Sequence, residues 1–228
     1  MVDLTTSTQS DLAELVNSSV AKSGEVIAAE FQSAGRGRLD RSFEAPPESA
    51  LLFSFFLKPK RARSDWSFIS FLAAIAVQEV ISKDIADKVS LKWPNDILIG
   101  ERKVAGLLAQ QIGDGVIVGI GLNVAMSADE LPVPTATSLA LSGSNNLDRN
   151  TLLTDFLSSL ESIYAEWESG ADFLEKYRQI SSTLGRQVRV EVLGRDPIEA
   201  EAVAITAQGA LILRDGFEVN VGDVVHLR

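Results

Sequence analysis

The chain has 228 residues and an acidic balance, because 21 basic and 31 acidic side chains give a formal net charge of −10, which disfavours general binding to nucleic acid. It has no cysteine, which excludes disulfides, thiolate metal sites and cysteine nucleophiles, and the single histidine, His226, argues against a histidine triad or a multi-histidine metal site. Without a run of about eighteen apolar residues or a signal-peptide pattern, the protein is expected to be cytoplasmic, with no membrane span.

In the first part of the chain, apolar spacing and turn residues predict alternating helices and strands. A short amphipathic helix is expected over 8–22, ended by Ser23-Gly24. Ser64-Asp65 is expected to cap a helix from 66 to about 83, which is apolar nearly all round and should therefore pack against a sheet. The expected strands are 25–31, 51–57, 89–93, 96–99 and a hairpin of 103–112 with 115–124 around Gly113-Asp114.

The second part predicts a polar loop over 125–148, a helix from Asp148 or Asn150 to 168 and another over 171–181. From Gln187 the pattern changes to short alternating strands with glycine turns, which indicates a small β-barrel docked on the main domain. The expected fold class is α+β: a mostly antiparallel sheet covered by helices, followed by a C-terminal SH3-like barrel. The expected domains are 1–183 and 184–228.

The segment Gln32–Arg41 concentrates three arginines and two glycines within seven residues of this acidic chain. Glycine lets a backbone bend and approach a ligand closely. Arginine forms forked hydrogen bonds with phosphate or carboxylate. The segment is therefore interpreted as a loop that closes on an anion, although the same residues would also suit a solvated turn between strands.

Three further segments carry polar side chains at strand ends. Lys92–Asp96 (KWPND) presents a cation, an amide and a carboxylate at a rigid proline turn, and Asp96 could support Mg²⁺. Lys103–Leu108 begins a strand with a lysine that could direct a point charge into a cleft, while a glycine in that strand leaves space for a ligand. Gly119–Asn123 (GIGLN) has two glycines that clear space and ends in an amide. Each segment alone is a weak signal.

The order of these segments resembles the successive motifs of a biotin protein ligase, also called biotin–[acetyl-CoA-carboxylase] ligase, and Ser7-Thr8-Gln9 is similar to that family's Ser-Thr-Asn signature. The resemblance extends over essentially the whole chain. It implies a class II synthetase-like fold and a two-step reaction that uses biotin, Mg²⁺ and ATP. Biotin would first be converted to biotinyl-5′-AMP and then transferred to a lysine of a biotin carboxyl carrier domain of a biotin-dependent carboxylase.

The resemblance also implies roles for individual residues. The catalytic residues would be Lys103, Arg38 and Arg36, with Lys92 as a supporting charge. The residues that bind biotin would be Ser7, Thr8, Gln9, Gln32, Gly35, Arg36, Lys103 and Gly106. The residues that bind ATP or the adenylate would be Arg38, Arg41, Phe43, Asn95, Asp96 and Asn123, and Asp96 would support the metal.

Several features depart from the family pattern. Gln9 replaces the usual Asn, Leu39 and Asp40 stand where many relatives are more basic, and Phe43 replaces a Trp expected to stack on adenine. The short segment before Ser7 leaves no room for the winged helix-turn-helix of the repressor members, so no specific DNA binding is expected. The alternatives are a lipoate or octanoyl protein ligase and a non-catalytic biotin-binding regulator.

Overall fold

The computed structural model describes residues 2–38, 41–192 and 194–227. The elements of the main domain are β1 (Val2–Thr5), α1 (Thr8–Asn17), β2 (Val26–Gln32), β3 (Ala50–Leu57), η1 (Arg63–Phe68), α2 (Ile69–Ile81), β4 (Val89–Lys92), β5 (Asp96–Ile99), β6 (Arg102–Ile112), β7 (Gly115–Asn123), η2 (Ala140–Ser142), α3 (Arg149–Glu168) and α4 (Leu174–Ile180). The C-terminal strands are β8 (Gln187–Glu191), β9 (Ile198–Ile205), β10 (Leu211–Leu213), β11 (Glu218–Val219) and β12 (Asp223–His226).

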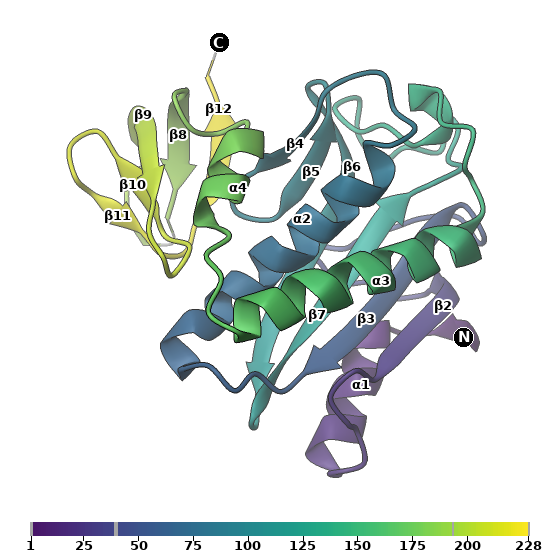
Figure 1. Ribbon diagram of the computed structural model, residues 1–228. Helices are drawn as coiled ribbons and strands as arrows, with labels where there is room; N and C mark the ends of the chain where they lie inside the picture. Colours follow the sequence, from purple (N-terminus) through teal and green to yellow (C-terminus); the bar gives the residue numbers. More distant parts are fainter. Residues whose placement is uncertain (1, 39–40, 193, 228) are drawn as a thin grey trace.

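The main domain is built on a seven-stranded sheet in the order β1-β2-β3-β7-β6-β5-β4 (Figure 1). Only the pairing of β1 with β2 is parallel, and the other neighbours run antiparallel. The predicted α+β class with a mostly antiparallel sheet is therefore confirmed. Strand β1 was not expected: its residues alternate between apolar and polar side chains, but the run has only four residues, which are largely exposed.

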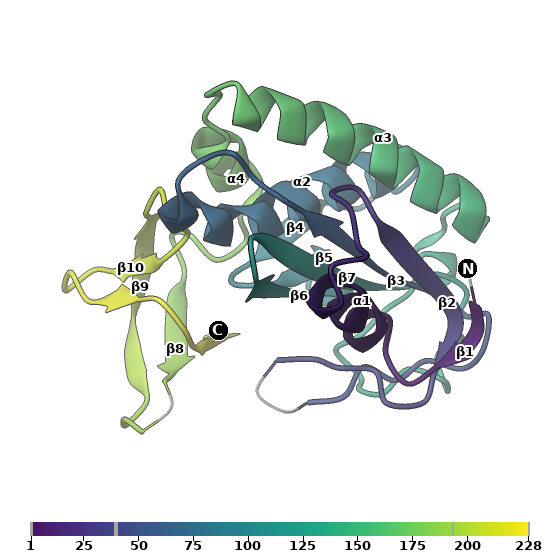
Figure 2. The ribbon, with the colours of Figure 1, turned by 90° about the horizontal axis from the view of Figure 1, so that it is seen from below.

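The two faces of the sheet differ because successive side chains of a strand point to opposite sides. Phe53 and Phe55 point to the face covered by α2 and α3, where the ring of Phe53 meets that of Phe156 edge-on at 5.0 Å. On the other face, Phe56 packs with Leu12 of α1. Figure 2 shows α2 and α3 above the sheet and α1 below it. The second face is only partly covered, and it carries the candidate site.

Three predicted helices have different bounds in the structure. The helix expected over 171–181 is α4, which begins only at Leu174. Helix α1 ends at Asn17 rather than near residue 22, because the Ser18 hydroxyl donates to the Glu14 carbonyl and Ser19 has a φ of 58°. The helix expected from residue 66 begins instead with the 3₁₀ turn η1. Ser64-Asp65 does not cap it, because no side chain caps η1 and the Asp65 carboxylate faces Arg61 at 3.5 Å.

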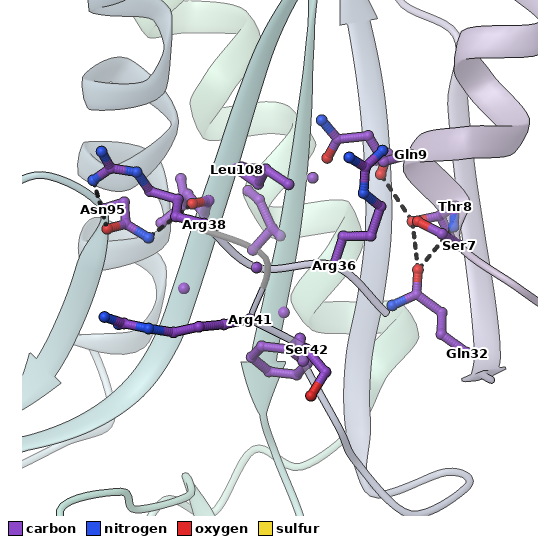
Figure 3. A pocket seen from close by; sticks show the side chains of 18 of the residues that line it. Ser7, Thr8, Gln9, Gln32, Arg36, Arg38, Arg41, Ser42, Asn95 and Leu108 are labelled. Atoms are coloured by element: carbon purple, nitrogen blue, oxygen red, sulfur yellow. Dashed lines mark hydrogen bonds between the residues drawn. The ribbon is translucent and has the colours of Figure 1, made fainter. Parts of the chain in front are cut away.

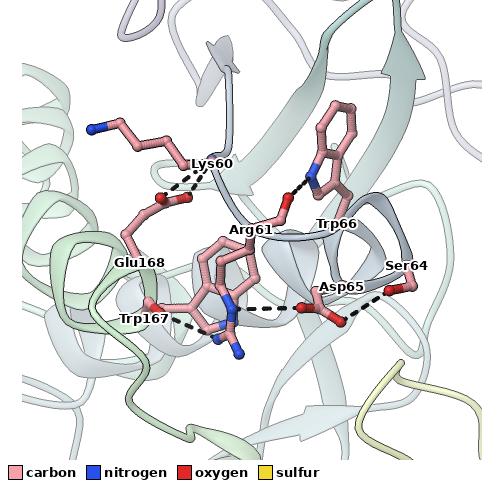
Figure 4. A network of polar contacts seen from close by, with 7 residues as sticks. All are labelled: Lys60, Arg61, Ser64, Asp65, Trp66, Trp167 and Glu168. Carbon is pink, nitrogen blue, oxygen red and sulfur yellow. Dashed lines mark hydrogen bonds and ion pairs between the residues drawn. The ribbon is translucent and has the colours of Figure 1, made fainter.

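The start of η1 is tied to the end of α3 (Figure 4). The Arg61 guanidinium lies 4.6 Å from the centre of the Trp167 ring and also donates to its carbonyl oxygen. The carboxylate of Glu168 accepts a hydrogen bond from the Lys60 amide at 3.0 Å. These contacts fix the crossing of α3 over the sheet, since they hold its last turn against the chain that leads into α2.

By length and composition, Arg63–Ile81 could cross a membrane, with a mean hydropathy of 1.3. However, 67% of its most apolar window is buried inside the protein. This stretch contacts α3 on one side and the strands on the other, as the core helix of a folded domain does.

The C-terminal strands form a five-stranded antiparallel sheet in the order β11-β10-β9-β8-β12. Among the described residues, the edge strands β11 and β12 are not paired with each other, so the expected barrel is an open sheet. The small size of β11, with two residues, leaves little backbone for closure. The sheet is linked to β4, because the amide of Trp93 donates to the Thr183 hydroxyl at 3.0 Å and the Trp93 indole donates to the Gly209 carbonyl at 2.9 Å.

Candidate functional site

A cavity lies on the partly covered face of the sheet, between the start of α1, the arginine segment and strands β5, β6 and β7. Twelve of the residues expected at the site line it: Ser7, Thr8, Gln9, Gln32, Arg36, Arg38, Arg41, Phe43, Asn95, Asp96, Lys103 and Gly106. The lining carries four basic side chains against two carboxylates, although the chain has a net charge of −10. The cavity is therefore a local basic site in an acidic protein.

The floor of the cavity consists of three glycines on one face of the hairpin. Gly119 and Gly121 alternate along β7 with residues that point into the core, and Gly106 of β6 pairs with Gly121. A Cβ would lie 2.4 Å from Gln9 Oε1 at Gly119, 2.5 Å from the Phe43 ring at Gly121 and 3.1 Å from Lys103 Nζ at Gly106. The glycines therefore mark successive positions along the cavity, from an amide to an aromatic ring to a cation.

One end of the cavity is polar and has no ionised side chain among its buried groups. Ser7, Thr8 and Gln9 are at most 4% exposed, and α1 starts at Thr8. The Thr8 amide donates to Gln32 Oε1 at 2.8 Å, and the Thr8 hydroxyl lies 2.8 Å from that of Ser54. Gln9 Nε2 is buried without a hydrogen-bond partner among the described residues. This end can exchange several hydrogen bonds with a neutral polar head group.

The other end is charged. Lys103 Nζ lies 2.6 Å from Asp96 Oδ1, and a guanidinium nitrogen of Arg38 lies 3.4 Å from Asn95 Oδ1. The Asn95 amide also donates to the carbonyl of Leu107 at 3.0 Å, which holds it against β6. Figure 3 shows Arg38 and Asn95 on one side of the cavity and Thr8 and Gln32 on the other. A ligand with a neutral head and an anionic tail would match this arrangement.

Arg38 is the most enclosed cation at the charged end. Burial lowers the pKa of Arg38, while the charges of Asp223 and Asp96 act in the opposite direction and raise it. Asp223, from the C-terminal sheet, also forms an ion pair with Arg41. The loop arginines therefore face carboxylates from two different parts of the chain, and an incoming anion would compete with these carboxylates.

Lys103 reaches the cavity because of a β-bulge. The register between β5 and β6 shifts between Ile97 and Leu98, which leaves Val104 as an extra residue in β6. In a regular strand, residues three apart point to opposite faces, so Lys103 would point away from the face of Gly106. The bulge re-aims the lysine, and its Nζ lies close above Gly106.

The arginine segment folds back on itself. Arg36 forms an isolated antiparallel bridge with Ser42, and the Phe43 amide donates to the Gly35 carbonyl at 3.0 Å. A Cβ on Gly35 would lie 2.3 Å from the Phe43 carbonyl oxygen, which requires glycine there. This return brings the Phe43 ring over Gly121. Leu39 and Asp40 lie outside the described residues.

Not every expected residue lines the cavity. Asn123 lies on the cavity side of β7, but its amide donates to the Thr137 carbonyl at 2.9 Å. Gly35 is buried against the Phe43 carbonyl oxygen and the Gln32 side chain. Lys92 lies away from the cavity, where its charge acts on His226. Sequence reasoning missed Ser54 and Asp223. An apolar strand gives no signal for a single serine, and Asp223 lies among the C-terminal strands and glycine turns, where the sequence indicated no site residue.

Comparisons with known proteins agree with this geometry. The sequence model described as "Biotin/lipoate A/B protein ligase family" matches residues 1–126, and "Biotin protein ligase C terminal domain" matches residues 183–227. The biotin–[acetyl-CoA-carboxylase] ligase of Mycobacterium tuberculosis is 36% identical, over 100% of this chain and 88% of that protein. The bifunctional ligase/repressor BirA of Escherichia coli is 34% identical over 86% of this chain, but only 63% of its own length is matched.

Among solved structures, the biotin protein ligase from Aquifex aeolicus in complex with biotin and ATP superposes with a TM-score of 0.83 at 28% identity. That match covers 100% of this chain and 97% of the other. The apo structure of the same protein gives a TM-score of 0.78. By its full-length match to a curated relative, its two family domains and its fold, the chain belongs to the biotin protein ligases of the biotin/lipoate A/B protein ligase family.

Proposed function

We propose that this protein activates biotin with Mg-ATP and transfers it to a lysine of a biotin carboxyl carrier domain of a biotin-dependent carboxylase. The observation that carries this proposal is the two-ended cavity, in which neutral hydrogen-bonding side chains face one end and a cluster of cations faces the other. Biotin has a neutral polar ring system and a carboxylate tail, and its adenylate adds a phosphate beside that carboxylate. The cavity offers matching groups in the same order.

The reaction needs two displacements. A carboxylate oxygen of biotin bonds to the α-phosphorus of ATP while the bond to the bridging oxygen breaks, and pyrophosphate leaves. The neutral amine of the acceptor lysine then attacks the acyl carbon, the bond from that carbon to the phosphate oxygen breaks, and AMP leaves as the amine loses a proton. Neither displacement needs a protein nucleophile, so alignment and stabilisation of developing negative charge would supply the catalysis.

Each end of the cavity takes a proposed role. At the neutral end, the polar side chains would hold the biotin ring. At the charged end, Lys103 would lie between the biotin carboxylate and the phosphate, and Arg38 would stabilise charge on the phosphate oxygens. Phe43 would stack on the adenine, Asn95 would orient the nucleotide, and Arg36 would contact the biotin carboxylate. We also propose a domain boundary between residues 183 and 184.

The residues at the charged end fit a magnesium ion that arrives with the nucleotide. Among the described residues, no group of three or more Asp, Glu, His or Cys side chains could hold a metal ion by itself. Mg²⁺ commonly takes one or two carboxylates together with substrate phosphates, and Asp96 supplies such a carboxylate at the cavity. When bound, the ion would neutralise charge on the phosphates, and Asp96 would then exchange its contact with Lys103 for the metal.

We further propose that the protein acts in the cytoplasm, without specific DNA and without a membrane. The support is the net charge of −10, together with the burial of the apolar stretch Arg63–Ile81. A gel shift with genomic DNA fragments at moderate salt tests whether the protein binds specific DNA. A shift that responds to biotin would contradict the proposal.

The function is tested by incubating the protein with biotin, Mg-ATP and a carrier domain and then measuring the mass of the carrier. We expect the carrier to gain the mass of one biotinyl group, and pyrophosphate to appear only when biotin is present. Reactions without ATP, with lipoate in place of biotin, and with a carrier whose acceptor lysine is changed to arginine serve as controls. Transfer of lipoate at a rate equal to that of biotin would contradict the assignment of substrate.

A further inference from the structure

The C-terminal sheet contributes one residue to the lining of the cavity among the described residues, Asp223 at the start of β12. Its carboxylate pairs with the guanidinium of Arg41, 182 positions away in the sequence. The Arg41 side chain is 62% exposed and that of Asp223 is 21% exposed. The contact therefore joins an exposed arginine of the loop to a carboxylate that is largely enclosed by the fold.

Asp223 is the rigid partner in this pair. It is paired with Glu191 in the antiparallel ladder between β12 and β8. The preceding Gly222 packs so tightly that a Cβ there would lie 3.0 Å from the Glu191 carbonyl oxygen. Arg41, by contrast, belongs to a glycine-containing loop that loses much backbone entropy when it is ordered. A fixed carboxylate that holds the Arg41 side chain reduces the freedom of the backbone at Arg41.

The turn that Arg41 closes also carries Arg38. The Gly37 amide donates to the Arg41 carbonyl at 2.7 Å, and the Arg41 amide donates to the Arg38 carbonyl at 3.1 Å. Fixing the side chain of Arg41 therefore constrains the backbone from which Arg38 reaches Asn95. Asp223 also offsets part of the cost of burying Arg38, because among the charges that act on Arg38 it makes the largest contribution toward raising the pKa.

We propose that Asp223 is a positioning residue for adenylate formation, which holds Arg41 so that the loop presents Arg38 to the phosphate. The inference rests on the proposed function and changes one role in it. The resemblance assigns Arg41 to ATP binding, whereas its guanidinium is already engaged by Asp223. The phosphate would then meet Arg38 and Lys103, and Arg41 would act through the loop.

The test compares Asp223→Asn, which keeps the shape and removes the charge, with Glu191→Gln as the matched control from the paired position in β8. Single-turnover formation of biotinyl-adenylate should slow by about two- to fivefold in Asp223→Asn, the scale of a partly exposed ion pair. Biotin binding without ATP should be unchanged. The control should match the parent protein in both measurements.

Limited trypsin digestion gives a readout that does not need activity. Trypsin must bind the Arg41 side chain in the protease's own specificity pocket. Loss of the ion pair in Asp223→Asn should therefore speed cleavage after Arg41 by about two- to fivefold. Cleavage after Arg195, in the turn between β8 and β9, serves as the internal reference. Equal cleavage and equal adenylate formation in Asp223→Asn and the parent would overturn the inference.

A charge exchange separates positioning from direct contact. Arg41→Asp and Asp223→Arg should each slow adenylate formation, while the double variant should recover to within about twofold of the parent because the pair is restored in reverse. If the double variant forms adenylate with a loss of rate equal to the product of the two single losses, Arg41 itself binds phosphate, which contradicts the proposal. If the parent forms no biotinyl-adenylate, the proposed function fails, but the trypsin comparison still decides whether Asp223 holds the loop.

Discussion

Lys103 and Asp96 neutralise each other in the ligand-free protein, with 2.6 Å between Nζ and Oδ1. The lysine side chain is 38% exposed, so it can move toward an incoming anion without first being desolvated. A carboxylate and a phosphate that arrive together would compete with Asp96 for the ammonium group. The pair therefore keeps the cation at the point where negative charge would develop, which is the arrangement that electrostatic catalysis needs.

We predict that Lys103→Ala removes adenylate synthesis while the fold stays intact. Loss of one preorganised charge donor costs about 3 kcal/mol or more, which lowers the rate by roughly 10²-fold. The measurement is biotin-dependent release of pyrophosphate, and circular dichroism reports on folding. Lys92→Ala is the matched control, because that lysine lies near His226 and away from the cavity. A larger loss of pyrophosphate release in Lys92→Ala than in Lys103→Ala would contradict the assignment of Lys103 as the catalytic lysine.

The unpartnered amide of Gln9 leads to a second prediction. A buried donor without a hydrogen bond costs about 1–3 kcal/mol, so Gln9→Met, of similar volume, should raise the unfolding temperature of the ligand-free protein. The same change should weaken biotin binding about tenfold, since a hydrogen bond at the neutral end is lost. Differential scanning fluorimetry and calorimetry measure the two effects. A lower unfolding temperature for Gln9→Met would mean that Nε2 already has a partner.

At the scale of elements, part of the site could be predicted from the sequence. The glycines of β7 recur at alternate positions, so they lie on one face while the residues between them fill the core. The face of Lys103 could not be predicted, because it depends on the bulge at Val104. No residue type marks that bulge, which arises from the pairing of β6 with β5.

The arginine segment should become protected when ligands bind. Gly35 and Gly37 make the segment costly to order, and the carboxylate and phosphate of biotinyl-adenylate would supply partners for its cations. Closure would also shield the reactive anhydride from water. We therefore expect trypsin to cut after Arg36 and Arg38 more slowly with biotin plus Mg-ATP than without ligands.

The fragments are identified by mass spectrometry, and cleavage after Arg195 is the reference that should not respond to ligands. A ligand that merely slowed the protease would change both sites equally. If cleavage of the segment proceeds at the same rate under proven saturation, the segment does not close over the ligand.

At the scale of the whole molecule, the sequence predicted the C-terminal strands and their turns but not where they dock. Those turns are local and follow from glycine positions, whereas the docking contacts join residues far apart in the chain. Thr183 links to Trp93 and to His226, and Asp223 reaches the cavity. Because β11 and β12 do not pair among the described residues, the sheet is open, a difference that strand patterns alone do not reveal.

We expect His226 to couple the docking of the C-terminal sheet to pH. Burial, followed by the charges of Lys92 and Arg186, lowers the pKa of His226 to about 4. The Thr183 hydroxyl accepts the Trp93 amide proton at 3.0 Å, so its own proton can be donated to His226 Nε2 at 3.1 Å. With the hydroxyl as donor, Nε2 accepts through its free lone pair, and protonation of the ring would reverse the direction of this hydrogen bond.

The sign of the pH dependence follows from the direction of the shift. Since the pKa is lower in the folded protein, the unfolded chain takes up a proton first as the pH falls. The contribution of His226 to stability is therefore complete above the ordinary histidine pKa of about 6.5 and is lost progressively toward pH 4. We predict that the urea midpoint of the parent decreases between pH 7 and pH 4.5 more steeply than that of His226→Gln. Parallel curves for the two proteins would show that His226 does not couple docking of the C-terminal sheet to pH.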